Sequence, residues 1–176
     1  MESAGPIAPK TPIGEIFMDL FTCLHVLISL VGIFSGFVVV FGMIGDRPLP
    51  GWTATFLSTT VATSVTGFMF PVHHFMPSHA VGTVSLIVLT FTLLARYKFD
   101  LAGAWRRTYA VTAVIALYLN VFVLVVQAFL KIPALHALAP NGKEPPFAAA
   151  QGTVLIVFVA LGIAAARKFR APPELS

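Results

Sequence analysis

The sequence predicts an all-α protein, a bundle of five transmembrane helices. The chain of 176 residues is 57% hydrophobic and only 10% charged, whereas a soluble domain is usually about a quarter charged. Its mean hydropathy is +0.90, and five stretches are apolar over roughly the 20 residues that a helix needs to cross a hydrocarbon core. So much apolar surface cannot be hidden in a water-soluble core of this size, so lipid is expected to surround most of it.

Residues that begin or end helices set the bounds of each predicted span. The turn from Gly45 to Pro48 ends the first span, Pro71 ends the second, and Pro77 is a favoured first residue for the third. Two adjacent prolines precede the fifth. The predicted spans are Met18–Ile44, Trp52–Phe70, Pro77–Tyr97, Thr108–Leu130 and residues 147–166.

These spans predict one transmembrane domain over residues 18–170, with an outer N-terminal tail over residues 1–17 and a cytoplasmic tail over residues 171–176. The count falls to four if the two shortest spans, the second and the third, form a re-entrant pair, or if the first span is cleaved. The tail before the first span carries Glu2 and Glu15 beside Lys10, which is not the positive n-region of a signal peptide. We therefore expect five spans.

Lys and Arg residues predict the orientation. Eight of the eleven basic residues fall in three segments at the ends of the spans that alternate onto one side of the membrane, and Lys10, Lys131 and Lys143 fall on the other. Cytoplasmic loops are the ones enriched in Lys and Arg, so the N-terminus is predicted outside and the C-terminus in the cytoplasm. The eight are Arg47, Arg96, Lys98, Arg106, Arg107, Arg167, Lys168 and Arg170.

Two further features fit this orientation. The segment Ile132–Leu138 is apolar but too short to span, and Pro133 favours a short helix lying at the outer interface, like a lid over the bundle. Aromatic residues of the type that anchor helices at an interface gather near the inner face: Trp52, Tyr97, Trp105 and Tyr109.

Small and hydroxylated residues predict how the spans pack, because helices in lipid associate through close backbone approach and interhelical hydrogen bonds. The first span carries Gly32 and Gly36 in a GxxxG pattern, and the second is dense in Ser and Thr. Such hydroxyls can bond back to the carbonyls of their own helix, so they need not line a pore. A polar stripe of the fourth span, with Asn120 and Gln127, is the predicted partner of the first span.

Polar residues in the outer half of the predicted bundle form a candidate ligand site: His25, Asn120, Gln127, His136 and Gln151. A quinone headgroup would lie among such groups, with its tail between helices. Alternatively, a b-type haem would be held between His25 and His79, although roughly 10 Å separates their expected depths at a rise of 1.5 Å per residue. The same side chains would serve equally well as interhelical hydrogen bonds.

A second group of histidines, His73, His74 and His79, is a candidate metal site before and at the start of the third span. With His136 it offers imidazole ligands, which suit Zn²⁺ or Cu²⁺. Adjacent histidines point apart in most conformations, however, and the sequence has no H-E-x-x-H motif. A solvated histidine loop is the alternative interpretation.

No residue is predicted to be catalytic. Cys23 is the only cysteine, the sequence has no G-x-S-x-G motif, and carboxylates are few, so neither nucleophilic nor acid–base catalysis is indicated. Five spans do not divide into two inverted repeats, as many secondary transporters do. A channel for ions or small molecules would require an oligomer whose second spans line a pore.

Two parts of the chain carry a family resemblance: Thr66–Pro71 with Leu94–Tyr97, and the run from Leu117 through Gln127 to Pro140. They resemble small polytopic inner-membrane proteins of bacteria to which no activity is assigned, and the resemblance covers the second to fifth spans. It implies a bacterial inner membrane and no catalytic residue. It also singles out Asn120, Gln127 and His136 as positions to test.

We therefore expect a non-catalytic accessory or subunit protein of the membrane, with an outward-facing His/Gln/Asn cluster. Its expected partners are the lipid bilayer and either other membrane subunits or further copies of itself, and no nucleic acid, because the basic residues flank apolar spans. Two alternatives stay open: a redox membrane protein that binds haem b or quinone, and a conducting oligomer.

Overall fold

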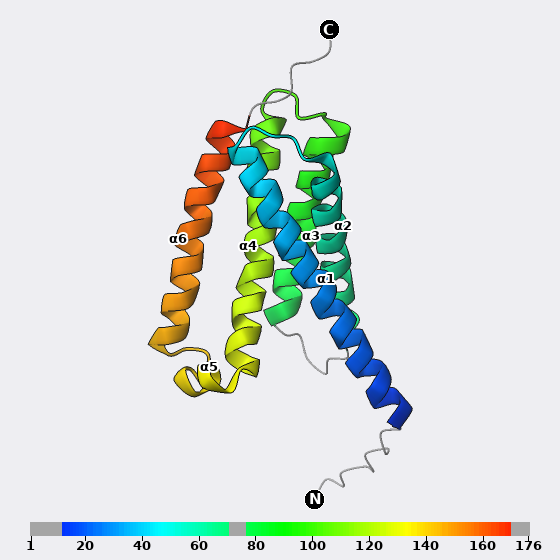
Figure 1. Cartoon of the computed structure of the whole chain (residues 1–176), viewed down its shortest axis with the longest axis vertical. Helices are drawn as coiled ribbons and strands as arrows, with labels where there is room; N and C mark the ends of the chain where they lie inside the picture. Colours follow the sequence, from blue (N-terminus) through cyan, green and yellow to red (C-terminus); the bar gives the residue numbers. More distant parts are fainter. Residues whose placement is uncertain (1–11, 71–76, 170–176) are drawn as a thin grey trace, which may run out of the picture.

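The structure is a computed structural model that describes residues 12–70 and 77–169, and every regular element within these two ranges is helical. The all-α class predicted from the sequence is thus confirmed for the described residues. The elements are α1 (Pro12–Ile44), α2 (Pro50–Gly67), α3 (Pro77–Leu93), the π-helical turn η1 (Leu94–Lys98), α4 (Trp105–Lys131), α5 (Pro133–Leu138) and α6 (Pro145–Lys168). The five long helices lie side by side in one bundle, with α5 across one end (Figure 1).

Among the described residues, four helices are long and apolar enough to cross a membrane. They are α1, α3 together with η1, α4 and α6, and the first of them begins at Pro12, ahead of the predicted start at Met18. Helix α2 is not one of them, because its 18 residues are rich in Thr and Ser, which lower its hydropathy. Hydropathy alone therefore supports four spans, and the predicted count of five is not confirmed by it.

Helix α2 nevertheless buries one of its faces in the bundle. Its buried residues recur every three or four positions, which places them on one side of the helix; they are Thr53, Phe56, Leu57, Thr60 and Ser64. Several of its hydroxyls donate to carbonyls one turn earlier, as Thr59 does to Thr55 at 2.6 Å and Thr66 to Ala62 at 2.7 Å. These bonds satisfy hydroxyls that would otherwise be costly away from water.

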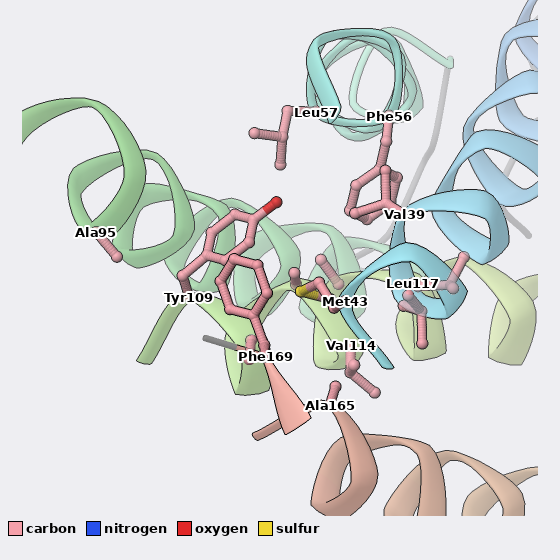
Figure 2. Close-up of a cluster of buried hydrophobic side chains, with 14 of the residues drawn as sticks. Val39, Met43, Phe56, Leu57, Ala95, Tyr109, Val114, Leu117, Ala165 and Phe169 are labelled. Atoms are coloured by element: carbon pink, nitrogen blue, oxygen red, sulfur yellow. The ribbon is translucent and has the colours of Figure 1, made fainter. Parts of the chain in front are cut away.

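The main core lies in the half of the bundle that contains the end of α1 and the start of α4 (Figure 2). Tyr109 of α4 is its largest fully buried side chain, at 1% exposure. The expectation that Tyr109 anchors the protein at the interface was therefore wrong: its ring is enclosed by α1, α2 and Phe169 rather than by lipid headgroups. The side chains around it include Val39, Met43, Leu57, Ala95 and Phe169.

Close approach of α1 to its neighbours depends on the predicted GxxxG glycines. A Cβ atom placed on Gly36 would lie 2.6 Å from Leu117 Cδ1 and 2.9 Å from Phe56 Cε2, and one on Gly32 would lie 3.2 Å from Thr59 Oγ1. Helix α1 therefore packs on α2 and α4 together, through backbone surface that only glycine leaves open.

The predicted short helix after α4 is present as α5, but none of its residues is buried. It contacts α4 and lies across the ends of α4 and α6, away from α2 (Figure 1). The following turn is held by Glu144, whose carboxylate accepts hydrogen bonds from Asn141 Nδ2 at 2.8 Å and from the Lys143 backbone N–H at 2.9 Å. Gly142 supplies the left-handed backbone, at φ 65°, that this turn requires.

We expect this turn to loosen in acid. Desolvation raises the pKa of Glu144, but hydrogen bonds from Asn141 and from the Lys143 backbone outweigh it and lower the pKa to about 2 from an ordinary 4.5. Because the folded-state pKa is depressed, the stabilisation is fully present above pH 4.5 and is lost as the pH falls towards 2. An NMR titration should show the carboxyl titrating near pH 2, and Asn141→Ala should move that pKa towards 4.5. An ordinary pKa in the unmodified chain would contradict this account.

Candidate functional site

His25 is the predicted ligand residue of α1, and its side chain contacts α2. Its Nδ1 lies 2.8 Å from Thr66 Oγ1, and its half-buried ring meets Phe70 edge-on, with centroids 5.1 Å apart. The Thr66 hydroxyl also lies 2.7 Å from the Ala62 carbonyl. When it donates to that carbonyl it accepts from His25, and the neutral imidazole is then the Nδ1–H tautomer, with its lone pair on Nε2.

Asn120 of α4 also bonds to α2. Its Nδ2 donates to Thr60 Oγ1 at 3.3 Å, and Thr60 is fully buried. A third bond of 2.9 Å joins the hydroxyls of Ser64 in α2 and Ser85 in α3, both buried. Helix α2 therefore makes a side-chain hydrogen bond to each of α1, α3 and α4, which the Ser/Thr density of the sequence suggested only in general terms.

The other three predicted ligand residues lie away from this set of bonds. Gln127 of α4 and His136 of α5 are exposed. Gln151 of α6 donates to the Phe122 carbonyl at 3.2 Å and so links α6 to α4, while its Oε1 is buried without a partner among the described residues. His25 and Asn120 thus share α2 as a partner but use different hydroxyls, and the structure does not gather the five residues around one ligand position.

The candidate metal ligands fall partly outside the description. His73 and His74 lie between residues 70 and 77, where nothing is described, and His79 lies in the first turn of α3, with its ring 5.5 Å from that of Phe68. Within residues 12–70 and 77–169, no group of three or more His, Cys, Asp or Glu side chains is placed to hold a metal ion. The metal hypothesis therefore stays a prediction.

A small cavity at the other end of the bundle, lined by both apolar and polar side chains, was missed by sequence reasoning. It has a volume of about 80 Å³ and lies under the α1–α2 turn, between Arg47, Arg96 and Tyr109. The Arg96 guanidinium lies 5.6 Å from the centre of the Tyr109 ring, and its Nε is buried without a hydrogen-bond partner in the described part of the chain. Tyr109 lines the cavity together with Thr53 of α2. The local sequence places Arg96 and Tyr109 only near the inner face; their contact depends on how α3 and α4 pack.

In the described part of the chain, four long apolar helices bundled with a hydrogen-bonded polar helix are consistent with a multi-pass integral membrane protein. No protein-family model, no curated protein and no solved structure matches the chain. The function is therefore argued from the arrangement of the helices and their polar side chains.

Proposed function

We propose that the chain is a non-catalytic accessory or subunit protein of the bacterial inner membrane, with five spans, an outer N-terminus and a cytoplasmic C-terminus. The observation that carries this proposal is the pairing of polar groups inside the bundle: His25 with Thr66, Asn120 with Thr60, and Ser64 with Ser85. Each pair joins α2 to a different helix. Polar side chains that bond to one another in this way hold helices together in lipid. This use of the polar groups fits a non-catalytic subunit better than an enzyme active site.

The fifth span of this proposal is α2. Its 18 residues extend over about 27 Å at 1.5 Å per residue, close to the roughly 30 Å of a hydrocarbon core. Helix α1 ends and α3 begins at opposite ends of the bundle, and α2 runs between these ends beside both helices (Figure 1). The low hydropathy of α2 is compatible with a membrane span, because a hydroxyl that makes a hydrogen bond costs much less free energy in lipid than one that makes none.

The charge distribution supports the proposed orientation. Basic residues of the α1–α2 turn, of the α3–α4 connection and of the end of α6 share one end of the bundle (Figure 1). Lys131 and Lys143 lie at the other end, beside α5. The more basic end belongs in the cytoplasm. The assignment to a bacterial inner membrane rests on the family resemblance.

Cysteine labelling tests the fifth span directly. In a Cys23→Ala background we expect Met69→Cys, at the outer end of α2, to react with a membrane-impermeant maleimide in intact cells. Pro48→Cys, just before the inner end of α2, should react only after the membrane is permeabilised. Met69 is 65% exposed and Pro48 is also exposed, so access within the fold is comparable. Equal labelling of both sites in intact cells would refute the fifth span.

The packing role predicts a measurable coupling between Asn120 and Thr60. In a double-mutant cycle with Asn120→Ala and Thr60→Ala, we expect about 0.6 kcal/mol of interaction energy, and at most about 1.7 kcal/mol, as for other hydrogen bonds between membrane helices. Unfolding of the purified protein by a denaturing detergent measures it. Gln127→Ala on the exposed side of α4 is the control and should leave stability unchanged. If Gln127→Ala destabilises the protein as much as Asn120→Ala does, the Asn120–Thr60 hydrogen bond does not explain the stability of the bundle.

One observation favours a second function, a redox protein that binds haem or quinone. His25 holds its Nδ1 2.8 Å from the Thr66 hydroxyl, and in the Nδ1–H tautomer of this pair Nε2 keeps its lone pair, which is how a histidine that ligates a metal is usually oriented by its surroundings. The visible spectrum of the protein purified from its membrane decides between the accessory role and the haem form of this second function. A Soret band that is lost in His25→Ala and kept in Gln127→Ala would replace the accessory role with haem binding.

A further inference from the structure

An apolar groove runs between α4 and α6 on the outside of the bundle. Its volume is about 330 Å³, and its lining is almost entirely carbon, from Val111, Ile115 and Tyr118 of α4 and Val159, Gly162 and Ile163 of α6 among others. Where it reaches the middle of the bundle, the rings of Tyr118 and Phe158 meet with centroids 5.7 Å apart. The groove therefore has a floor at mid-depth and extends towards the end of the bundle where α4 starts and α6 ends.

The helical register continues each side of the groove into an arginine. Arg107 lies one turn before Val111 on α4, and Arg167 lies one turn after Ile163 on α6. Both arginines are exposed. Their helix ends are held together, because the ring of Phe169 packs on that of Tyr109, with centroids 5.8 Å apart. By this register, the apolar groove runs towards two cations at one end of the bundle.

This combination matches the two parts of a phospholipid. The volume lies at the lower end of the roughly 300–1,000 Å³ of ligand pockets, and apolar walls give an acyl chain close contacts at no cost in desolvation. Two guanidinium groups at the mouth suit a phosphate, which arginine binds with paired hydrogen bonds. Basic clusters between helices on the cytoplasmic side are the places where anionic headgroups are held. A neighbouring apolar helix would use the groove but would leave both arginines uncompensated.

We propose that the α4–α6 groove is a binding site for one anionic phospholipid, with an acyl chain between the helices and the headgroup phosphate on Arg107 and Arg167. The site would lie in the inner leaflet, and this placement rests on the orientation proposed above. The binding itself depends only on the two helices and their charged ends.

The test measures lipid binding to the full chain, purified in a neutral detergent and delipidated. Native mass spectrometry and thermal unfolding are followed while phosphatidylglycerol, phosphatidylcholine or inorganic phosphate is added. We expect one phosphatidylglycerol to be retained per chain and to raise the melting temperature, and neither of the other two probes to do so. Equal retention of phosphatidylcholine would overturn the proposal, as would an equal effect of inorganic phosphate, which would show a phosphate site without a lipid.

The two arginines and the groove are then removed separately. Arg107→Gln and Arg167→Gln should each weaken phosphatidylglycerol binding about fivefold, whereas Lys98→Gln, an exposed cation of η1, should not. Gly162→Leu should fill the groove, since a Cβ there already lies 3.6 Å from Val114 Cγ1, whereas Gly152→Leu on the same helix meets nothing within 4 Å. Unchanged affinity in the arginine variants, or equal loss in both glycine variants, would refute the site.

Failure of this site and failure of the proposed orientation are distinguishable. The binding measurements are made in detergent and do not depend on which end of the bundle faces the cytoplasm. The cysteine labelling of α2 depends on orientation and span count and does not involve α4 or α6. Retained lipid with reversed labelling would keep the site and move it to the outer leaflet.

Discussion

Tyr109→Ala is expected to destabilise the protein by about 3 kcal/mol. Replacing a large buried aromatic residue by alanine costs about 3–5 kcal/mol in soluble proteins. The lower end applies here, because in lipid the unfolded helix also keeps the side chain out of water and the cavity left behind accounts for most of the loss. Tyr109 is 1% exposed, and its ring packs against Arg96 and Phe169. Unfolding in a denaturing detergent, followed by circular dichroism, measures the change.

Two further variants test whether the stability lost in Tyr109→Ala comes from the buried ring, from the hydroxyl, or from the loss of any aromatic ring at this end of the bundle. Tyr109→Phe keeps the ring packing and removes only the hydroxyl at the cavity shared with Thr53, so we expect a loss of at most about 1 kcal/mol. Tyr97→Ala removes an aromatic ring at the same end of the bundle that is 58% exposed, and it should change stability little. Similar losses for Tyr97→Ala and Tyr109→Ala would show that the core around Tyr109 is not where the stability resides.

Gly36→Ala is expected to cost about 1–3 kcal/mol, the usual penalty of overpacking a filled interior. The new methyl group would lie 2.6 Å from Leu117 Cδ1 and 2.9 Å from the Phe56 ring. Leu117 can rotate away at small cost, but the ring of Phe56 is fully buried, so α1 must move away from α2 or α4. Thermal unfolding of the variant in detergent gives the loss.

A graded glycine series provides the control for this prediction. Gly32→Ala should cost less, because the nearest atom to its Cβ would be Thr59 Oγ1 at 3.2 Å, followed by Thr60 Oγ1 at an ordinary 3.5 Å. Gly51→Ala should be neutral or slightly stabilising, because nothing lies within 4 Å of it. Equal effects at all three positions would mean that a general change in helix propensity, and not the contact of α1 with α2 and α4, explains the result.

The candidate ligand site shows where sequence reasoning stops. Residue type and approximate depth in the membrane can be read from the sequence, and they predicted His25, Asn120 and Gln151 as candidate ligand residues. The partners of these side chains are set by the rotation of each helix about its axis, which no pattern in one sequence specifies when the helices are apolar on every side. The structure gives them three different partners: Thr66, Thr60 and the Phe122 carbonyl.

For helix α2 and Tyr109, the sequence alone suggests surroundings that differ from those in the folded structure. Composition alone makes α2 the least certain span, because its hydroxyls lower its hydropathy. Their bonds to α1, α3 and α4 explain how it can remain within an apolar bundle. Tyr109 has the sequence context of an interfacial anchor, beside Arg106 and Arg107, yet α1, α2 and Phe169 enclose it.

By itself the sequence determined the helical class, the approximate ends of the long helices and the concentration of positive charge at one end. Length, hydropathy and charge are local properties, and a helix satisfies its own backbone wherever it lies in lipid. Only the tertiary structure decided which hydroxyl each polar side chain meets, which aromatic ring is buried, and that the stripes of α4 and α6 form one groove ending in Arg107 and Arg167. These features depend on contacts between segments far apart in the chain, and such contacts exist only once the helices have packed.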